Sequence, residues 1–158
     1  MTFLVWNLLL ALAWVVLTGR FTPGNLLAGL VLGYGALLFA HRAIGGPSPY
    51  FRKVPHVLGL VLFFLWELIL SSLRVAYDVL TPTHHMRPGI VGIPLDLRTD
   101  VEITLLANLI TLTPGTLSLE VSPDRRTLYI HVMYIDDADA VRRRVKEGFE
   151  RRILEVLR

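Results

Sequence analysis

Three ionisable side chains lie in the longest hydrophobic segment, residues 56–80: Glu67, Arg74 and Asp78. A charged group in a membrane segment costs about 2.5 kcal/mol or more to insert, which argues for a partner or a function. Arg74 follows Glu67 by two helical turns on one face, and Asp78 lies four residues beyond Arg74. We therefore expect an intramembrane polar contact, formed for assembly with a neighbouring subunit. A role of Glu67 in a proton path is the alternative.

The remaining groups that could do chemistry form no known catalytic or metal-binding pattern. The five histidines include no HExxH arrangement and accompany no nucleophile motif. His84 and His85 are adjacent and point apart on a strand or loop, which favours a linker over a metal site. Asp136, Asp137 and Asp139 lack the glycine and distal glutamate of a calcium loop, which favours helix capping. We expect no catalytic, cofactor-binding or metal-binding residue, and no enzyme.

Acidic residues divide the chain into two parts. Of the 13 acidic residues, Glu67 and Asp78 precede position 96, and the other eleven lie within residues 96–158. The net charge of +3 arises from basic residues beside hydrophobic segments, which favours anionic lipid as a partner. The sequence lacks a basic patch interleaved with aromatic residues, which is the pattern that would indicate nucleic-acid binding. The sequence has no cysteine, which excludes disulfides. We predict a membrane domain over residues 1–80, a linker over 81–88 and a soluble domain over 89–158.

The membrane domain is predicted to contain three helical segments, at about residues 2–19, 25–40 and 56–80. The first two are short and are joined by "RFTPGN", in which Pro-Gly predicts a tight turn and antiparallel helices. Such a hairpin either crosses the bilayer or dips in and returns. A signal peptide is the competing interpretation of the first segment, but a basic amino-terminal region and a small-residue cleavage site are lacking. Residues 41–55 have the composition of a loop.

The soluble domain is predicted to be a small α/β fold with the order strand, helix, strand, strand, helix. Thr99 and Glu102 form a capping-box pair that starts the first helix, which ends near Leu112. A crossover is expected to make the first two strands parallel, and a hairpin to add the third. Alternation predicts these inward-facing residues in the second and third strands: Leu117, Leu119, Val121, Leu128, Ile130, Val132 and Tyr134.

The segment Thr113-Pro114-Gly115 lies between the first helix and the second strand. Pro114 stops a helix, and Gly115 accepts the positive φ that a tight turn needs. We expect a structural turn motif. The functional alternative is a rigid turn presented to a partner subunit.

The run "ANLITLTPGT" within Ala107 to Leu119, followed by "TLYIHVMYIDD" and preceded by three hydrophobic segments, resembles the E subunit of the multisubunit cation/proton antiporters of the Mrp type, also called Mnh or Pha. The likeness follows nearly the whole chain. It implies an accessory subunit of a bacterial plasma-membrane complex that exchanges Na⁺ or another monovalent cation for protons. It also implies other membrane subunits as partners, an ion path in larger subunits, no cofactor and a cytoplasmic carboxyl-terminal domain.

The distribution of positive charge conflicts with this topology. Arg42, Arg52 and Lys53 favour placing their loop inside, and three full crossings would then leave the soluble domain outside. We follow the resemblance and expect the domain inside. The competing function is a membrane-tethered binding or regulatory module, which would have a stable isolated domain from about Gly89 and a saturable small-molecule pocket.

Overall fold

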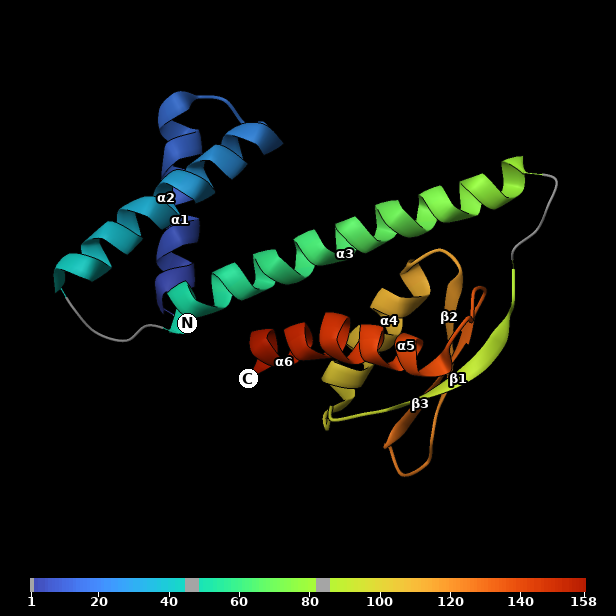
Figure 1. Cartoon of the computed structure of the whole chain (residues 1–158). Coiled ribbons are helices and arrows are strands. Elements are labelled where there is room, and N and C mark those ends of the chain that lie inside the picture. The colour runs from blue at the N-terminus through green and yellow to red at the C-terminus, as the bar shows by residue number, and fades with distance from the viewer. Residues whose placement is uncertain (1, 45–48, 82–85) are drawn as a thin grey trace. The chain divides into compact units, whose positions relative to one another are not determined.

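The computed structural model describes residues 2–44, 49–81 and 86–158, and the chain divides into two compact units, Met1–Pro55 and His56–Arg158. Figure 1 labels the α-helices and the strands. Their bounds are α1 Thr2–Thr18, α2 Pro23–Ile44, α3 Pro49–Leu80, β1 Gly89–Pro94, α4 Asp100–Leu112, β2 Thr116–Val121, β3 Thr127–Val132, α5 Ala138–Arg143, the π-helix η1 Arg144–Glu150 and α6 Arg151–Leu157.

In the first unit, α1 and α2 pack closely because glycines face α1. A methyl group on Gly29 would lie 3.0 Å from the Ala11 backbone, and one on Gly33 would lie 2.5 Å from Asn7 Oδ1. Asn7 is buried and donates from Nδ2 to the Tyr50 hydroxyl at 2.7 Å. Small residues that admit a neighbouring backbone are typical of membrane helix pairs. Gly35 has open space around its Cα and does not contribute to this contact.

The connections of the first unit are shorter than the sequence predicts. Pro23 is the first residue of α2, where a missing N–H leaves no hydrogen bond unmade, so the turn precedes the Pro-Gly pair. Residues 41–55, predicted as a loop, are helical over 41–44 and 49–55. Within the described part of the chain, two helices have the length and composition to cross a membrane, α2 over Pro23–Ala43 and α3 over Tyr50–Leu80, whereas the apolar α1 is shorter.

The second unit contains a three-stranded sheet covered on one face by helices. The strand order is β1-β3-β2, and both neighbours of β3 are antiparallel to it. β1 and β2 are therefore parallel to each other, as the crossover predicts, but they are not neighbours, because β3 lies between them. The crossover through α4 leaves room for the hairpin strand to insert centrally. Pro94 ends β1 at a sheet edge, where a missing N–H breaks no ladder.

The inward face of β2 is also different from the prediction. Leu117 and Leu119 are 46% and 48% exposed on the uncovered face of the sheet. Thr116 and Ser118 point toward α4 instead. Their hydroxyls donate to the carbonyls of Ile110 at 2.6 Å and Ala107 at 3.0 Å. Short hydroxyl side chains therefore hold β2 against α4, where leucines would force the two elements apart.

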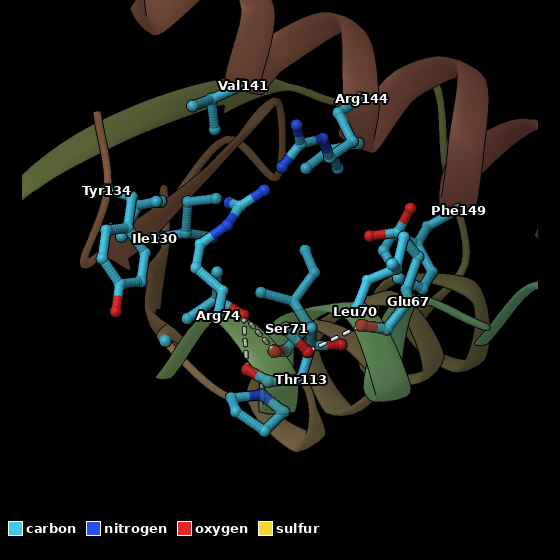
Figure 2. Close-up of a pocket in the computed structure, with 16 residues that line it drawn as sticks. Glu67, Leu70, Ser71, Arg74, Thr113, Ile130, Tyr134, Val141, Arg144 and Phe149 are labelled. Carbon is cyan, nitrogen blue, oxygen red and sulfur yellow. Dashed lines mark hydrogen bonds between the residues drawn. The ribbon is translucent and has the colours of Figure 1, made fainter. Parts of the chain in front are cut away.

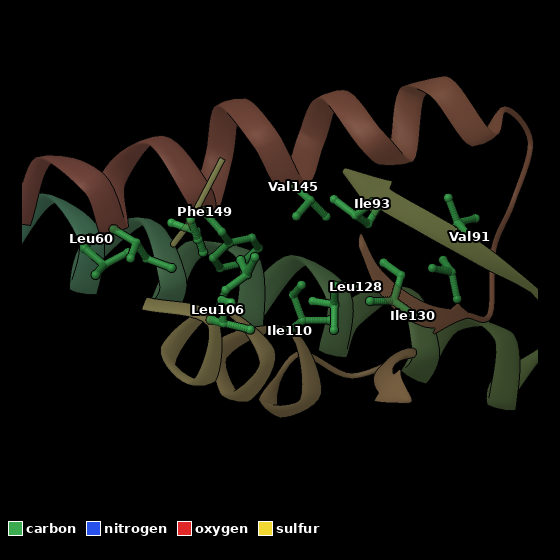
Figure 3. Close-up of a cluster of buried hydrophobic side chains, with 13 residues drawn as sticks. Leu60, Val91, Ile93, Leu106, Ile110, Leu128, Ile130, Val145 and Phe149 are labelled. Atoms are coloured by element: carbon green, nitrogen blue, oxygen red, sulfur yellow. The ribbon is translucent and has the colours of Figure 1, made fainter. Parts of the chain in front are cut away.

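The hydrophobic core joins the sheet, the helices of the α/β fold and α3. Figure 3 shows Leu60 of α3, Leu106 of α4 and Phe149 of η1 among the side chains that fill it. Phe63 of α3 packs edge-on against Phe149, with ring centroids 5.1 Å apart. The segment of α3 after His56 is thus part of the same compact unit as the α/β fold. That division records packing, and the predicted separation of membrane and soluble residues near position 80 stays a prediction.

Two buried carboxylates hold the segment between β1 and α4. Glu150 Oε1 accepts from the backbone N–H groups of Asp96 at 2.6 Å and Leu97 at 3.2 Å. Glu102 completes the capping box with Thr99, as the sequence predicts. Its carboxylate also pairs with Arg158 at 3.1 Å, and the hydrogen bond from this guanidinium is the main cause that lowers the pKa of Glu102 to about 2.

Candidate functional site

The two groups of residues singled out in the sequence meet at one cavity in the second unit. Glu67 and Arg74 of α3 line it together with the turn that contains Pro114 and Gly115 (Figure 2). The cavity has a volume of about 150 Å³, enough for several water molecules or a small polar group. Nothing in the sequence indicated that this turn, about 40 residues further along the chain, packs beside Glu67 and Arg74 of α3.

The turn forms one wall of the cavity, and hydrogen bonds within the turn and to the end of α4 hold its shape. Thr113 Oγ1 donates to the Leu109 carbonyl at 2.9 Å and thereby occupies a group that the end of α4 leaves unpaired. Gly115 has φ +85°, and the N–H of Thr116 donates to the Thr113 carbonyl at 3.1 Å to close the turn. A side chain at this φ would be strained, which explains the glycine.

The α3 wall contains separated polar groups. Ser71 lies between Glu67 and Arg74, and its hydroxyl donates to the Glu67 carbonyl at 2.6 Å, within its own helix. Two helical turns correspond to a rise of about 10 Å, so a direct pair between Glu67 and Arg74 would need both side chains to bend along the axis. Figure 2 shows the Glu67 carboxylate beside Phe149, at the opposite end of the cavity from Tyr134.

The third wall of the cavity contains Tyr134 and Arg144, two residues that the sequence did not single out as functional. The Arg74 guanidinium lies 5.6 Å from the centroid of the Tyr134 ring, a cation–π contact. Burial raises the pKa of the Tyr134 hydroxyl, and the nearby Asp78 carboxylate adds to the increase. Arg144 extends from η1 toward the same space as Arg74 in Figure 2. A tyrosine at the end of a strand and an arginine in an amphipathic helix are common surface features, so neither residue indicated a functional site in the sequence.

Asp78 belongs to a neighbouring, more open cavity of about 680 Å³ rather than to the first one. Arg74 and Tyr134 line both spaces. Asp78 itself is 4% exposed. The predicted set of three ionisable residues therefore shares one face of α3 but is distributed over two cavities.

The other candidates from the sequence have structural surroundings. Asp137 caps α5 by accepting from the N–H groups of Asp139 and Ala140, as expected for helix capping. His41 stacks on Phe51 with centroids 4.9 Å apart. His84 and His85 lie outside the described residues. Among residues 2–44, 49–81 and 86–158, no group of three or more histidine or acidic side chains could hold a metal ion.

The site thus combines one carboxylate, two guanidinium groups, a tyrosine and a rigid turn. Such groups can bind a polar partner or hold water, and they lack the paired nucleophile and base of hydrolytic catalysis. The arrangement is that of a contact site between a helix and an α/β fold.

Comparison with known proteins identifies the family. A family model described as Na⁺/H⁺ ion antiporter subunit matches residues 7–156. The E subunit of the Na⁺/H⁺ antiporter from Alkalihalophilus pseudofirmus is 39% identical over 95% of this chain and 94% of its own length. The corresponding E subunit from Bacillus subtilis is 39% identical over 96% of both chains.

A solved structure also resembles the fold. It comes from the membrane-bound sulfane sulfur reductase, an archaeal respiratory membrane complex. The matching chain is 32% identical, with a TM-score of 0.50 over 85% of this chain and 84% of the other. Sequence and fold therefore agree, and the apolar helices are those expected of a membrane protein. This chain belongs to the family of Na⁺/H⁺ ion antiporter subunits, as a relative of the E subunits.

Proposed function

We propose that this chain is an accessory subunit that assembles with other membrane subunits of a monovalent cation/proton antiporter and does not carry the main ion path. Its relatives over nearly the full length are named as the E subunits of Na⁺/H⁺ antiporters. The complex would contribute to Na⁺ and pH homeostasis at the bacterial plasma membrane. The chain would act by holding neighbouring subunits in place, without enzymatic activity.

The observation that carries the proposal is the apolar packing of the α1–α2 pair. Arg20 is the one charged residue among residues 2–41, and it lies in the connection between the helices. The polar side chains Asn7 and Asn25 are engaged with Tyr50 and Trp14 inside the unit. Ion paths across membranes need polar or charged groups at successive depths. An apolar pair packed at its glycines suits contact with lipid and with other membrane helices.

The polar face of α3 is proposed to serve assembly rather than proton transfer. Glu67, Ser71 and Arg74 surround a cavity closed by the turn, so a buried partner group or ordered water would complete their hydrogen bonding. Glu67→Gln keeps the shape of the side chain and removes its proton-binding charge. We expect near-normal Na⁺-dependent proton exchange in membrane vesicles when the variant complex is present in normal amount. Exchange abolished at normal complex abundance would assign Glu67 to a proton path.

The α/β fold is proposed to lie on the cytoplasmic side. Arg42 at the end of α2 and Arg52 and Lys53 near the start of α3 favour an inside location for the connection between these helices, and the α/β fold lies on the same side only when α3 does not cross the membrane. Further partners are the lipid bilayer and the antiporter subunits that contact the exposed apolar residues of α1 and α2.

Purification of the full-length tagged chain in mild detergent tests the assembly role. We expect larger hydrophobic antiporter subunits to accompany it in fixed proportion, as identified by mass spectrometry. A chain that emerges alone, from cells whose cation/proton exchange survives its deletion, would contradict the proposal.

The cavity also suits a second function, that of a membrane-tethered module that binds a small polar ligand through Arg74 and Arg144. This alternative predicts saturable ligand binding by the chain outside any complex. Ligand-independent co-purification with antiporter subunits distinguishes the two functions.

A further inference from the structure

The part of α3 after His56 has two chemically different faces. One face packs on the α/β fold through Leu60 and Phe63 and also bears Glu67, Ser71, Arg74 and Asp78. The other face is exposed and carries no charge; it consists of Leu58, Leu62, Leu65, Trp66, Ile69 and Leu73. A helix that crosses lipid needs an apolar surface wherever lipid surrounds it, whereas a helix at the membrane surface needs one apolar face.

Contact with the α/β fold runs along nearly this whole segment. At its beginning, His56 Nδ1 lies 3.7 Å from Glu155 Oε2. Near its end, Arg74 lies over Tyr134, and Asp78 lines a cavity with the same tyrosine. From His56 to Asp78 the helix rises about 33 Å, which equals or exceeds the ~30 Å hydrocarbon core of a bilayer. A crossing α3 would therefore carry the packed fold through the full depth of the membrane.

The charges of the fold make such a crossing unfavourable. The Arg152 guanidinium lies 4.0 Å from the Phe63 ring centroid, and Arg144 lies near the Arg74 end of the same face. Charged groups at successive levels of the hydrocarbon would each cost about 2.5 kcal/mol or more. The outer edges of β1 and β2 would also lack water for their unpaired backbone groups. The packing seen in the second unit and a membrane-crossing α3 exclude each other.

The charge distribution of the sequence provides an independent argument. Arg42, Arg52 and Lys53 favour the inside, and three crossings would then place the α/β fold outside. If α3 does not cross, the basic residues and the fold lie on the same side, and the conflict disappears. The exposed Trp66 and Tyr77 on α3 are residue types enriched where membrane meets water.

We infer that residues 56–80 lie along the surface of the membrane, with the uncharged face directed into the lipid and the α/β fold on the aqueous side. The lipid bilayer is the partner of this face. Hydrophobicity alone predicts that α3 is a third membrane-crossing helix, whereas here it lies along the membrane surface. The cavity with Glu67 and Arg74 then opens near the level of the headgroups, where ionisable side chains keep access to water.

Because the natural sequence contains no cysteine, single cysteines report topology without background. We would introduce Arg52→Cys and Arg125→Cys, which lie at exposed positions before and after residues 56–80, and Arg20→Cys in the connection between α1 and α2. Each full-length variant is labelled with a membrane-impermeant maleimide in intact cells and in everted vesicles. We expect positions 52 and 125 to react from the same, cytoplasmic side. Reaction of these two positions from opposite sides would overturn the inference.

A depth measurement on the apolar face gives a second test that does not depend on the first. Spin labels at Leu58, Leu65 and Leu73 are compared by their collision rates with oxygen and with a water-soluble nickel reagent. A surface helix predicts similar depths at all three positions. A crossing helix predicts a depth that is greatest at the middle position and smaller at both ends, and this result would refute the surface location. Labels at Leu62 and Ile69 replace any variant that fails to accumulate.

Discussion

The α1–α2 pair and the α/β fold bury polar groups by different means. In the pair, Gly29 and Gly33 bring two apolar helices together, and the buried polar side chain is the neutral amide of Asn7. In the fold, the carboxyl groups of Glu102 and Glu150 lie at nearly inaccessible positions. Their charge is balanced by Arg158, Lys146 and backbone N–H groups. The comparison suggests that the first unit is built for lipid, where a charge has no water nearby, and the second for contact with water.

The largest loss of assembly is expected from a substitution at Gly29, where the backbones of α1 and α2 are in contact. In Gly29→Leu, the new side chain would begin 3.0 Å from the Cα and carbonyl oxygen of Ala11, which belong to a helix backbone and cannot rotate away. We expect α1 and α2 to separate and the chain to be lost from the complex, measured by co-purification. Gly35→Leu is the matched control, since nothing lies within 4 Å of its position, and should assemble normally. Equal assembly of both variants would show that the close packing is dispensable.

A smaller effect, a loss of stability, is expected from a substitution at Gly148, where the added side chain would meet another side chain and not a backbone. A methyl group on Gly148 would lie 2.7 Å from Cζ of Phe63, so Gly148→Leu should displace α3 from η1. Overpacking of this kind costs about 1–3 kcal/mol. We expect a lower thermal midpoint of the purified chain in detergent and faster proteolysis of the α/β fold. In the control Gly59→Leu, the added side chain meets open space on α3, and both properties should stay as in the natural chain.

The prediction of local structure succeeded where neighbouring residues determine the result. Thr99 and Glu102 begin α4 because each side chain bonds the other residue's backbone, and α4 ends before Pro114. The order of strands depends instead on contacts between distant segments. Leu117 and Leu119 follow the alternation of a buried strand face, but the hydroxyls of β2 bind α4 and direct these leucines outward.

The candidate site was predicted in pieces. Glu67 and Arg74 stand out because charge is rare in hydrophobic sequence, and Pro-Gly stands out as a turn. The cavity that joins them could not be predicted, since Leu60 and Phe63 look like lipid-facing residues until Phe149 is seen beside them. The same apolar composition therefore serves a lipid-facing surface and a protein core.

A destabilisation of comparable size is expected at the buried carboxylate of Glu102, and it disappears at low pH. The folded-state pKa of Glu102, about 2, lies below the ordinary value of 4.5, so the charged carboxylate stabilises the fold fully above about pH 4.5. That contribution is lost as the pH falls toward 2. We expect Glu102→Gln to lower the unfolding free energy by roughly 1–3 kcal/mol at pH 7, with a difference that shrinks on acidification. The exposed Glu120→Gln is the control and should show no such pH-dependent difference.

The most direct test of the accessory role is ion exchange by the purified full-length chain alone in proteoliposomes. With a pH gradient imposed and Na⁺ or K⁺ added outside, we predict no cation-dependent proton movement beyond that of protein-free vesicles, whereas the assembled complex dissipates the gradient. Cation-dependent dissipation by the chain alone would contradict the account, because it would place an ion path within this subunit.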